Sequence, residues 1–299
     1  MESVITDIQR FSLSDGAGIR TSIFFKGCNI RCEWCHNPET ISRNPQLIFY
    51  RTKCIGCGSC FSACPKNAHR LENGSHIIDR NLCMNCGKCA SVCYAEALVM
   101  CGRRMTVAEI MSEVRQDIQY YRDSGGGVTL SGGEVLCQRE FAAELVKACH
   151  AEKINVAVET NLSLPFDEIK DFLSSVDYIM CDIKIFDSGI HKKYTGIENT
   201  EILRNIRLLD SLCVPFTVRT PLIPGVTDSN KNISAIAKYI VNLKNLQSYE
   251  LLNFNPLGAE KYKGLDKINR FLKAGPLDKD RLDELEELVQ NIGVKVKIV

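Results

Sequence analysis

The chain has 299 residues, of which 45% are hydrophobic and 24% charged, so it is long enough to bury a core without disulfides and is not a disordered chain. Its 37 basic and 36 acidic residues leave a net charge of +1, which gives no support for a nucleic-acid or membrane-surface partner. No apolar run reaches the length of a membrane span, and the first residues lack the pattern of a signal peptide, so we expect a cytoplasmic protein.

Strand and helix patterns alternate along the chain on both sides of a cysteine-rich segment. After that segment, Thr106 and Glu109 predict a capping box, and the apolar residues that follow recur at helical spacing as far as Ile118. Strands are predicted at 21–26, 127–130, 155–160, 178–184, 215–220, 249–254 and 294–298. Further helices are predicted at about 138–151, from 166, and at about 200–211, 230–243 and 282–292, with a polar loop after 254.

Repeated strand–helix units predict an α/β fold with a parallel sheet, whose active site lies at the carboxyl ends of the strands. About six such units suit a partial (β/α)6 TIM-like barrel better than a complete eight-stranded one, which needs about 250 residues. The pattern alone does not separate an incomplete barrel from an open, doubly wound sheet. We adopt the partial barrel as the expected fold.

Cysteine is the compositional outlier, with 16 residues, 11 of them between Cys28 and Cys93. Thiols stay reduced in the cytoplasm, so clustered cysteines indicate metal ligands before disulfides. One cysteine pattern occurs twice, with an offset of 29 residues between the copies that begin at Cys54 and Cys83. We therefore expect a ferredoxin-like domain at 48–102, inserted into a barrel domain formed by 1–47 and 103–299.

Each copy reads Cys-x2-Cys-x2-Cys-x3-Cys, and Pro65 follows the first copy, as in two-cluster bacterial ferredoxins. In that pattern three thiolates surround one [4Fe–4S] cluster and the fourth turns toward the other cluster. The predicted ligand sets are Cys54, Cys57, Cys60 and Cys93 for one cluster, and Cys64, Cys83, Cys86 and Cys89 for the other. A pair of zinc sites is the alternative, although zinc sites usually use two close pairs of ligands.

A third motif, Cys28-x3-Cys32-x2-Cys35, has three cysteines and no fourth nearby. A cluster held by three thiolates keeps one iron open to a ligand from outside the protein, which is typical of a catalytic metal site. His36 is an alternative fourth ligand, but it follows Cys35 too closely to reach the same cluster. A structural site or three buried thiols is the other alternative.

This spacing resembles the cluster motif of radical S-adenosylmethionine (SAM) enzymes. Segments 9–21 and 24–39 around it resemble the signature of glycyl-radical-enzyme activating enzymes, the group that includes pyruvate formate-lyase activase. The two-cluster insert is similar to that of the larger members, and the resemblance extends along most of the chain. It implies three [4Fe–4S] clusters, one that binds SAM and two auxiliary ones.

The resemblance also implies which side chains bind SAM at the predicted strand ends. Ser131–Glu134 would contact the methionyl amino group, since glycines allow close approach and a carboxylate suits an ammonium. The alternative for this segment is a tight turn without a ligand. Asp182 and Lys184 would also bind SAM, and the alternative for them is a structural Asp–Lys pair. The full predicted set of cofactor-binding residues is Trp34, Cys35, His36, Gly133, Glu134, Thr160, Asp182, Ile183, Lys184, His191 and Arg219.

Two further positions complete the predicted site. We expect His191 to be exposed near a helix start, and Asn255 stands where pyruvate formate-lyase activase has a SAM-contacting histidine. The resemblance further implies a monovalent cation near SAM. Its predicted ligands come from the segment Glu159–Asn161 together with Met180 and Asp182.

The function that the resemblance implies is activation of a partner glycyl radical enzyme. SAM would be cleaved reductively to a 5′-deoxyadenosyl radical, which takes a hydrogen atom from a backbone glycine of that partner. The predicted catalytic residues are Cys28, Cys32, Cys35 and Lys184, and the electron donor would be reduced flavodoxin or ferredoxin. The alternatives are a radical SAM enzyme acting on a small molecule or another peptide, and a ferredoxin-like electron carrier.

Overall fold

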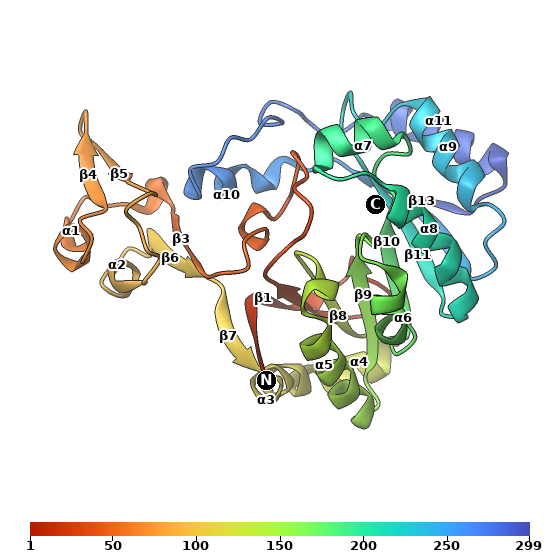
Figure 1. Ribbon diagram of the computed structural model, residues 1–299, viewed down its shortest axis with the longest axis horizontal. Helices are drawn as coiled ribbons and strands as arrows, with labels where there is room; N and C mark the ends of the chain where they lie inside the picture. The colour runs from red at the N-terminus through yellow and green to blue at the C-terminus, as the bar shows by residue number, and fades with distance from the viewer.

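A computed structural model describes residues 1–299, and its largest element is a nine-stranded sheet (Figure 1). The strands follow the order β13-β12-β11-β10-β9-β8-β2-β1-β7. Their bounds are β1 Glu2–Ser12, β2 Arg20–Phe25, β7 Arg103–Thr106, β8 Gly127–Gly132, β9 Asn155–Thr160, β10 Tyr178–Asp182, β11 Phe216–Leu222, β12 Leu246–Asn253 and β13 Val296–Ile298. Strands β2 and β8 to β13 run parallel, which confirms the predicted central parallel sheet.

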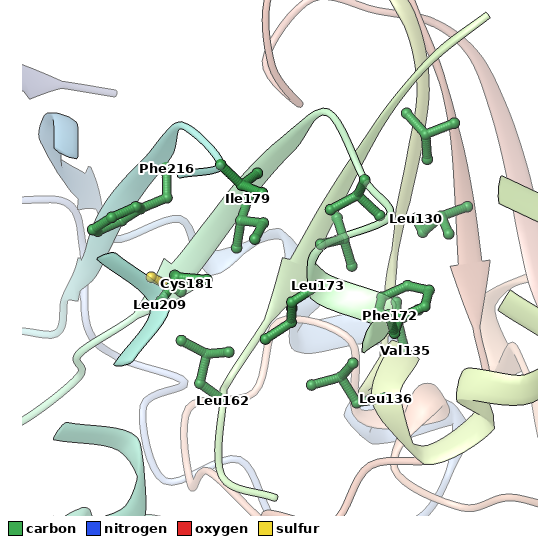
Figure 2. Packing of buried hydrophobic residues seen from close by; sticks show 14 of the residues in the cluster. Leu130, Val135, Leu136, Leu162, Phe172, Leu173, Ile179, Cys181, Leu209 and Phe216 are labelled. Carbon is green, nitrogen blue, oxygen red and sulfur yellow. The ribbon is translucent and has the colours of Figure 1, made fainter. Parts of the chain in front are cut away.

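Helices cover one face of this sheet. They are α3 Val107–Val114, α4 Ile118–Ser124, α5 Arg139–Ala151, α6 Phe166–Leu173, α8 Thr200–Leu209, α9 Asn230–Ile240 and α11 Lys279–Ile292. Helix α7 Ser188–Thr195 lies instead at the carboxyl end of the strands, where its last carbonyls accept hydrogen bonds from the loop after β2 (Figure 1). Along β10, Ile179 and Cys181 pack into the apolar core beneath the helices, where Phe172 and Leu209 also lie (Figure 2). Met180 and Asp182 alternate with them and line a cavity on the opposite face.

Local signals explain where several helices begin and end. The predicted capping box is present, because Thr106 Oγ1 accepts a 3.2 Å hydrogen bond from the Glu109 N–H and the Glu109 carboxylate accepts one of 2.7 Å from the Thr106 N–H. The predicted helix, which reached Ile118, is α3 followed by a 3-10 turn at Arg115–Asp117, and α4 continues beyond the prediction to Ser124. Helix α11 ends before Gly293, whose φ of +96° is readily adopted by glycine.

The cysteine-rich segment forms a small structure beside the sheet (Figure 1). Its elements are β3 Gln46–Phe49, α1 Ser59–Ala63, β4 His69–Glu72, β5 Ser75–Ile78, α2 Lys88–Ser91 and β6 Leu98–Cys101. Strand β3 pairs with β6 and β4 pairs with β5, each antiparallel. The 29-residue repeat is visible in the backbone, since α1 and α2 follow Gly58 and Gly87 with φ values of +78° and +79°.

Outside the insert, the elements that were not predicted are β1, β7, α4, α7 and α10 (Ala259–Gly264). The predicted polar loop after residue 254 is wrong in part, because α10 packs between the insert and the large sheet (Figure 1). Arg80 from the insert donates a 2.7 Å hydrogen bond to the Gly264 carbonyl, while Lys261 Nζ donates one of 2.7 Å to Glu39 Oε1. These tertiary contacts stabilise a helix too short to be stable by itself. None of the helices combines the length and the hydropathy needed to cross a membrane.

Candidate functional site

A cavity of about 550 Å³ lies at the carboxyl ends of β8 to β12. The predicted site residues that line it are Cys28, Cys32, Trp34, Cys35, His36, Gly133, Thr160, Asp182, Lys184 and Arg219. They come from the loop after β2 and from the ends of β8, β9, β10 and β11, so segments far apart in sequence meet there. Three predicted cofactor-binding residues, Glu134, Ile183 and His191, lie outside the lining.

Backbone hydrogen bonds hold the loop that carries the three cysteines. The Gly27 N–H donates to the Thr40 carbonyl at 2.6 Å, which closes the base of the loop. At its far side, the Arg31 and Glu33 N–H groups donate to carbonyls at the end of α7, at 2.8 and 3.0 Å. Trp34 packs in a small apolar cluster with Ile185 and Ile223, which anchors the loop above β10 and β11.

The three thiols share one buried environment. Burial raises the pKa of the Cys28 and Cys32 thiols to about 12 and that of Cys35 to about 11. None of the three is in a disulfide. Because thiols that burial keeps protonated need a bound cation to become thiolates, the donor set suits a metal cluster better than a free nucleophile.

The glycines after β8 allow two backbones to approach closely. A Cβ at Gly132, where φ is +108°, would lie 2.4 Å from the Phe25 backbone, and one at Gly133 would lie 2.3 Å from the Gly27 carbonyl oxygen. The Gly133 and Glu134 N–H groups donate to those two residues' carbonyls, each at 2.8 Å. This segment therefore fixes the start of the cysteine loop, and Gly133 also lines the cavity.

The Glu134 carboxylate points elsewhere. It is fully buried and accepts hydrogen bonds from the Thr160 hydroxyl at 2.8 Å, the Asn161 N–H at 2.7 Å and the Leu136 N–H at 3.1 Å. Burial raises its pKa to about 7, although these hydrogen bonds favour the charged form. In this structure the side chain supports the turn after β9 rather than facing the cavity, which differs from the expected contact with an ammonium group.

Asp182 and Lys184 form a pair at the cavity wall. Lys184 Nζ donates a 2.6 Å hydrogen bond to Asp182 Oδ2, and both side chains line the cavity. Burial alone lowers the pKa of Lys184, but the Asp182 carboxylate raises it above its usual value, as do Cys32 and Cys28 when they are thiolates. The pair is therefore charged beside the three cysteines. Ile183 between them is buried in the apolar core, so its side chain faces away.

Arg219 joins two carboxylates across the inner face of the sheet. Its guanidinium contacts Glu159 Oε1 at 2.5 Å and Glu250 Oε2 at 2.8 Å. Burial raises the pKa of Glu159, while Arg219 lowers it. Glu159 is thus engaged by Arg219, as Asp182 is by Lys184. The other expected cation ligands, Thr160, Asn161 and Met180, line the same cavity.

His191 is buried, with 1% of its surface exposed, so the prediction of an exposed residue is wrong. It lies in α7, and its Nδ1 is 2.8 Å from the Ile197 carbonyl oxygen. The signals for this helix were present: Asp187 accepts a hydrogen bond from the Ile190 N–H at 2.8 Å, and Gly196 follows the last turn. Helix α7 matters to the site because its last carbonyls bind the cysteine loop.

The cavity also contains Asp15, to which the sequence interpretation assigned no role, and the previously named Asn161 and Asn255. Asp15 accepts a 2.7 Å hydrogen bond from Ser12 Oγ, and Asn161 donates one of 3.0 Å to Asn29 Oδ1. Asn161 directly follows β9, at the edge of the parallel sheet where polar residues gather. Asp15 lies in the loop between β1 and β2, and its position in the sequence gave no such signal.

The insert contains two further groups of thiols. Cys54, Cys57, Cys60 and Cys93 line one cavity of about 270 Å³. Cys64, Cys83, Cys86 and Cys89 line another. In each group three cysteines from one copy of the repeat meet the fourth cysteine of the other copy, and none forms a disulfide. Four thiols around one space suit an iron–sulfur cluster.

Comparisons with known proteins agree with this chemistry. The family model of the radical SAM superfamily matches residues 84–234, and that of the 4Fe-4S dicluster domain matches residues 53–97. The chain is 38% identical to the indoleacetate decarboxylase activating enzyme of Tractidigestivibacter scatoligenes, over 99% of this chain and 96% of that protein. It is 42% identical to the (2S)-3-sulfopropanediol dehydratase activating enzyme of Klebsiella oxytoca, over 88% and 85%.

Solved structures support the same assignment. A domain of a pyruvate-formate lyase-activating enzyme from Bacteroides vulgatus ATCC 8482 superposes with a TM-score of 0.50 at 26% identity, covering 58% of this chain and 99% of that one. A radical SAM methyltransferase from Sphaerobacter thermophilus shares the fold, with a TM-score of 0.55 at 13% identity over 99% and 76% of the two chains. The predicted family is confirmed: this chain belongs to the glycyl-radical-enzyme activating enzymes of the radical SAM superfamily.

Proposed function

We propose that this chain activates a partner glycyl radical enzyme, with SAM bound in the cavity at the carboxyl ends of β8 to β12. The observation that carries the proposal is the meeting of three buried thiols with the Asp182–Lys184 pair in one cavity. Relatives named as activating enzymes cover most of the chain, and a radical SAM family model matches half of it.

Cys28, Cys32 and Cys35 are the proposed ligands of a [4Fe–4S] cluster. When bound, the reduced cluster supplies the electron that cleaves SAM to a 5′-deoxyadenosyl radical, which takes a hydrogen atom from a backbone glycine of the partner. Lys184 offers a fixed positive charge to a carboxylate at the cavity wall, and Asp182 offers a negative one. Trp34 packs with Ile185 and Ile223 and limits access of water to the cysteine loop.

The remaining proposed SAM contacts are His36, Gly133, Thr160 and Arg219, all of which line the cavity. Glu134, Ile183 and His191 are proposed as positioning residues, since their side chains lie outside the lining. The monovalent cation, if bound beside SAM, would use the segment Glu159–Asn161 together with Met180 and Asp182. Arg219 contacts the Glu159 carboxylate and Lys184 contacts that of Asp182, so each acid would share its charge with a cation bound there.

We also propose that the sheet is a partial barrel, formed by 1–47 and 103–299. Two observations support this arrangement. Helices from the parallel repeats pack on one face, whereas a doubly wound sheet carries them on both. On the other face, Met180 and Arg219 line both the candidate site and a second cavity of about 530 Å³, which extends toward the amino ends of the strands.

The insert at 48–102 is proposed to hold two auxiliary [4Fe–4S] clusters, which gives three in the whole protein. The support is the two groups of four thiols and the match to a 4Fe-4S dicluster family model. Reduced flavodoxin or ferredoxin is the proposed electron donor. Both are one-electron carriers, as cleavage of SAM by a reduced cluster requires.

Anaerobic reconstitution tests the proposal. The wild type is expected to bind about twelve irons and, with dithionite and SAM, to release 5′-deoxyadenosine. A variant with Cys28, Cys32 and Cys35 changed to Ala is expected to bind about eight irons and release none. Cys213→Ala, at an exposed cysteine outside all three groups, is the matched control. A fully loaded wild type that does not cleave SAM contradicts the proposal.

The partner step needs its own measurement. Incubation of the loaded enzyme and SAM with a glycyl radical enzyme is expected to give the doublet electron paramagnetic resonance (EPR) signal of a glycyl radical on that partner. Deoxyadenosine release without such a signal on any partner tested, but with modification of a small molecule or another peptide, would favour a different radical SAM reaction.

A further inference from the structure

Two histidines of the insert lie between its two thiol-lined cavities and have no part in the proposed function. His69 is in β4 and His76 is in the paired strand β5. His69 lines the cavity of the second group of cysteines, and His76 lines the cavity of the first. Nδ1 of His69 is 2.8 Å from Nε2 of His76, so the two rings are joined by a hydrogen bond.

The surrounding side chains hold His76 in this position. Its ring centroid lies 4.5 Å from that of Phe49 and 5.1 Å from that of Phe61. Its second nitrogen, Nδ1, is 3.9 Å from Sγ of Cys54. Nε2, which is hydrogen-bonded to His69, is also 3.9 Å from Sγ of Cys60. Both nitrogens therefore face predicted cluster ligands, but only Nδ1 has no other partner.

The hydrogen bond between the rings has two possible directions. If His69 Nδ1–H donates to His76 Nε2, then a neutral His76 carries its proton on Nδ1 and presents an N–H to Cys54. In the opposite direction, a lone pair of His76 would face the sulfur. A cluster ligand is a thiolate, which attracts an N–H and repels a lone pair. In the first direction the Nε2 lone pair near Cys60 is already used by the His69 N–H, and Cys54 receives an N–H. In the opposite direction an unused lone pair faces Cys54, so a bound cluster favours the first direction.

We propose that His76, oriented by His69, donates a hydrogen bond to the Cys54 thiolate and raises the reduction potential of the first auxiliary cluster. The proposal rests on the proposed function, because it requires that the insert holds clusters. Reduction adds negative charge to a cluster, and a donor at a ligand sulfur stabilises that charge. In this arrangement His69 uses its one N–H on His76, so it has none for the thiolates of the second cavity.

The test is an EPR-monitored redox titration of the full-length, reconstituted protein. His76→Phe keeps an aromatic ring between Phe49 and Phe61 and removes both nitrogens. It is expected to lower the midpoint potential of one cluster by about 59 mV, which is a tenfold change in a one-electron equilibrium. The other two potentials are expected to stay the same. His69→Phe is expected to give a smaller shift of the same sign.

Two more variants separate tuning from folding. His76→Asn retains an N–H donor on a shorter side chain and is expected to recover part of the shift. His150→Phe, at a half-exposed histidine of α5 paired with Asp177, is expected to leave all three potentials unchanged.

The outcomes are distinguishable. If His76→Phe binds all its iron and its potentials are unchanged, this inference alone is overturned. It is also overturned if the iron content falls to about eight in both His76 variants, because His76 would then be needed for cluster assembly. A wild type that binds only about four irons overturns both this inference and the auxiliary clusters. Deoxyadenosine release, measured in parallel, reports separately on the proposed function.

Discussion

The Glu134 carboxylate accepts a 2.7 Å hydrogen bond from the Asn161 N–H, which ties the turn after β8 to the turn after β9. The Thr160 hydroxyl donates to the same carboxylate at 2.8 Å. Thr160 and Asn161 both line the candidate site, so a buried acid behind the cavity wall determines where two of its lining residues lie.

We expect Glu134→Gln to destabilise the protein by roughly 1–3 kcal/mol. The carboxylate accepts from three donors, and an amide would place an N–H against one of them. Urea denaturation of the variant against the wild type measures the difference. Glu144→Gln is the control, since Glu144 is exposed on α5; equal losses in the two variants would contradict the role of Glu134.

The same residue predicts a pH dependence. The pKa of Glu134 is raised by burial from 4.5 to about 7, so the folded protein binds a proton that the unfolded chain releases. The free energy of unfolding should therefore fall as the pH rises from about 5 through 7, by about 3 kcal/mol at most from this group. Denaturation between pH 5 and 8 should show this decline in the wild type and in Glu144→Gln. If the free energy of unfolding of Glu134→Gln declines equally over this pH range, the decline comes from other titrating groups.

Arg219→Gln should cost about 3–5 kcal/mol, because it leaves the half-buried Glu159 and the buried Glu250 carboxylates without their shared cation. Arg219→Lys should lose less, since it keeps the charge but lacks the planar group that contacts both acids. Denaturation midpoints of the wild type, Arg219→Lys and Arg219→Gln measure this order of stability. Arg204→Gln breaks an exposed pair of 3.4 Å with Glu201 and should change stability by less than about 1 kcal/mol.

Lys184→Met should slow SAM cleavage by about 10²-fold or more, the scale of removing one preorganised charged donor from an active site. Its ammonium lies 2.6 Å from Asp182 beside the three thiols. Iron content should be unchanged, because no cysteine is altered. Deoxyadenosine release is the readout, and Lys231→Met on the exposed start of α9 is the control. Wild-type rates in Lys184→Met would remove this lysine from the catalytic set.

Lys261→Met should loosen the cysteine loop. Lys261 Nζ donates to Asn37 Oδ1 and Glu39 Oε1, each at 2.7 Å, and so joins α10 to the residues just after the motif. We expect hydrogen exchange at 33–41 to be about tenfold faster. Lys263→Met removes only a pair with exposed Glu260 and should leave that segment unchanged. Similar protection in both variants would show that α10 does not restrain the loop.

The sequence by itself was sufficient for the local and repetitive features. Strand β9 and the start of α6 lie at the predicted residues, because apolar alternation and helical spacing are properties of neighbouring residues. The 29-residue cysteine repeat likewise indicated the cluster chemistry, since ligand spacing restricts which cluster a segment can bind. The family resemblance rested on the same short motifs.

The tertiary structure decided the partners of the polar side chains. Glu134 supports Thr160 and Asn161, Arg219 joins Glu159 to Glu250, and His69 meets His76 only because separate strands bring them together. His191 is buried because α7 packs behind the cysteine loop. A charged or polar group takes the partner that burial leaves within reach, and sequence spacing carries no information about that distance.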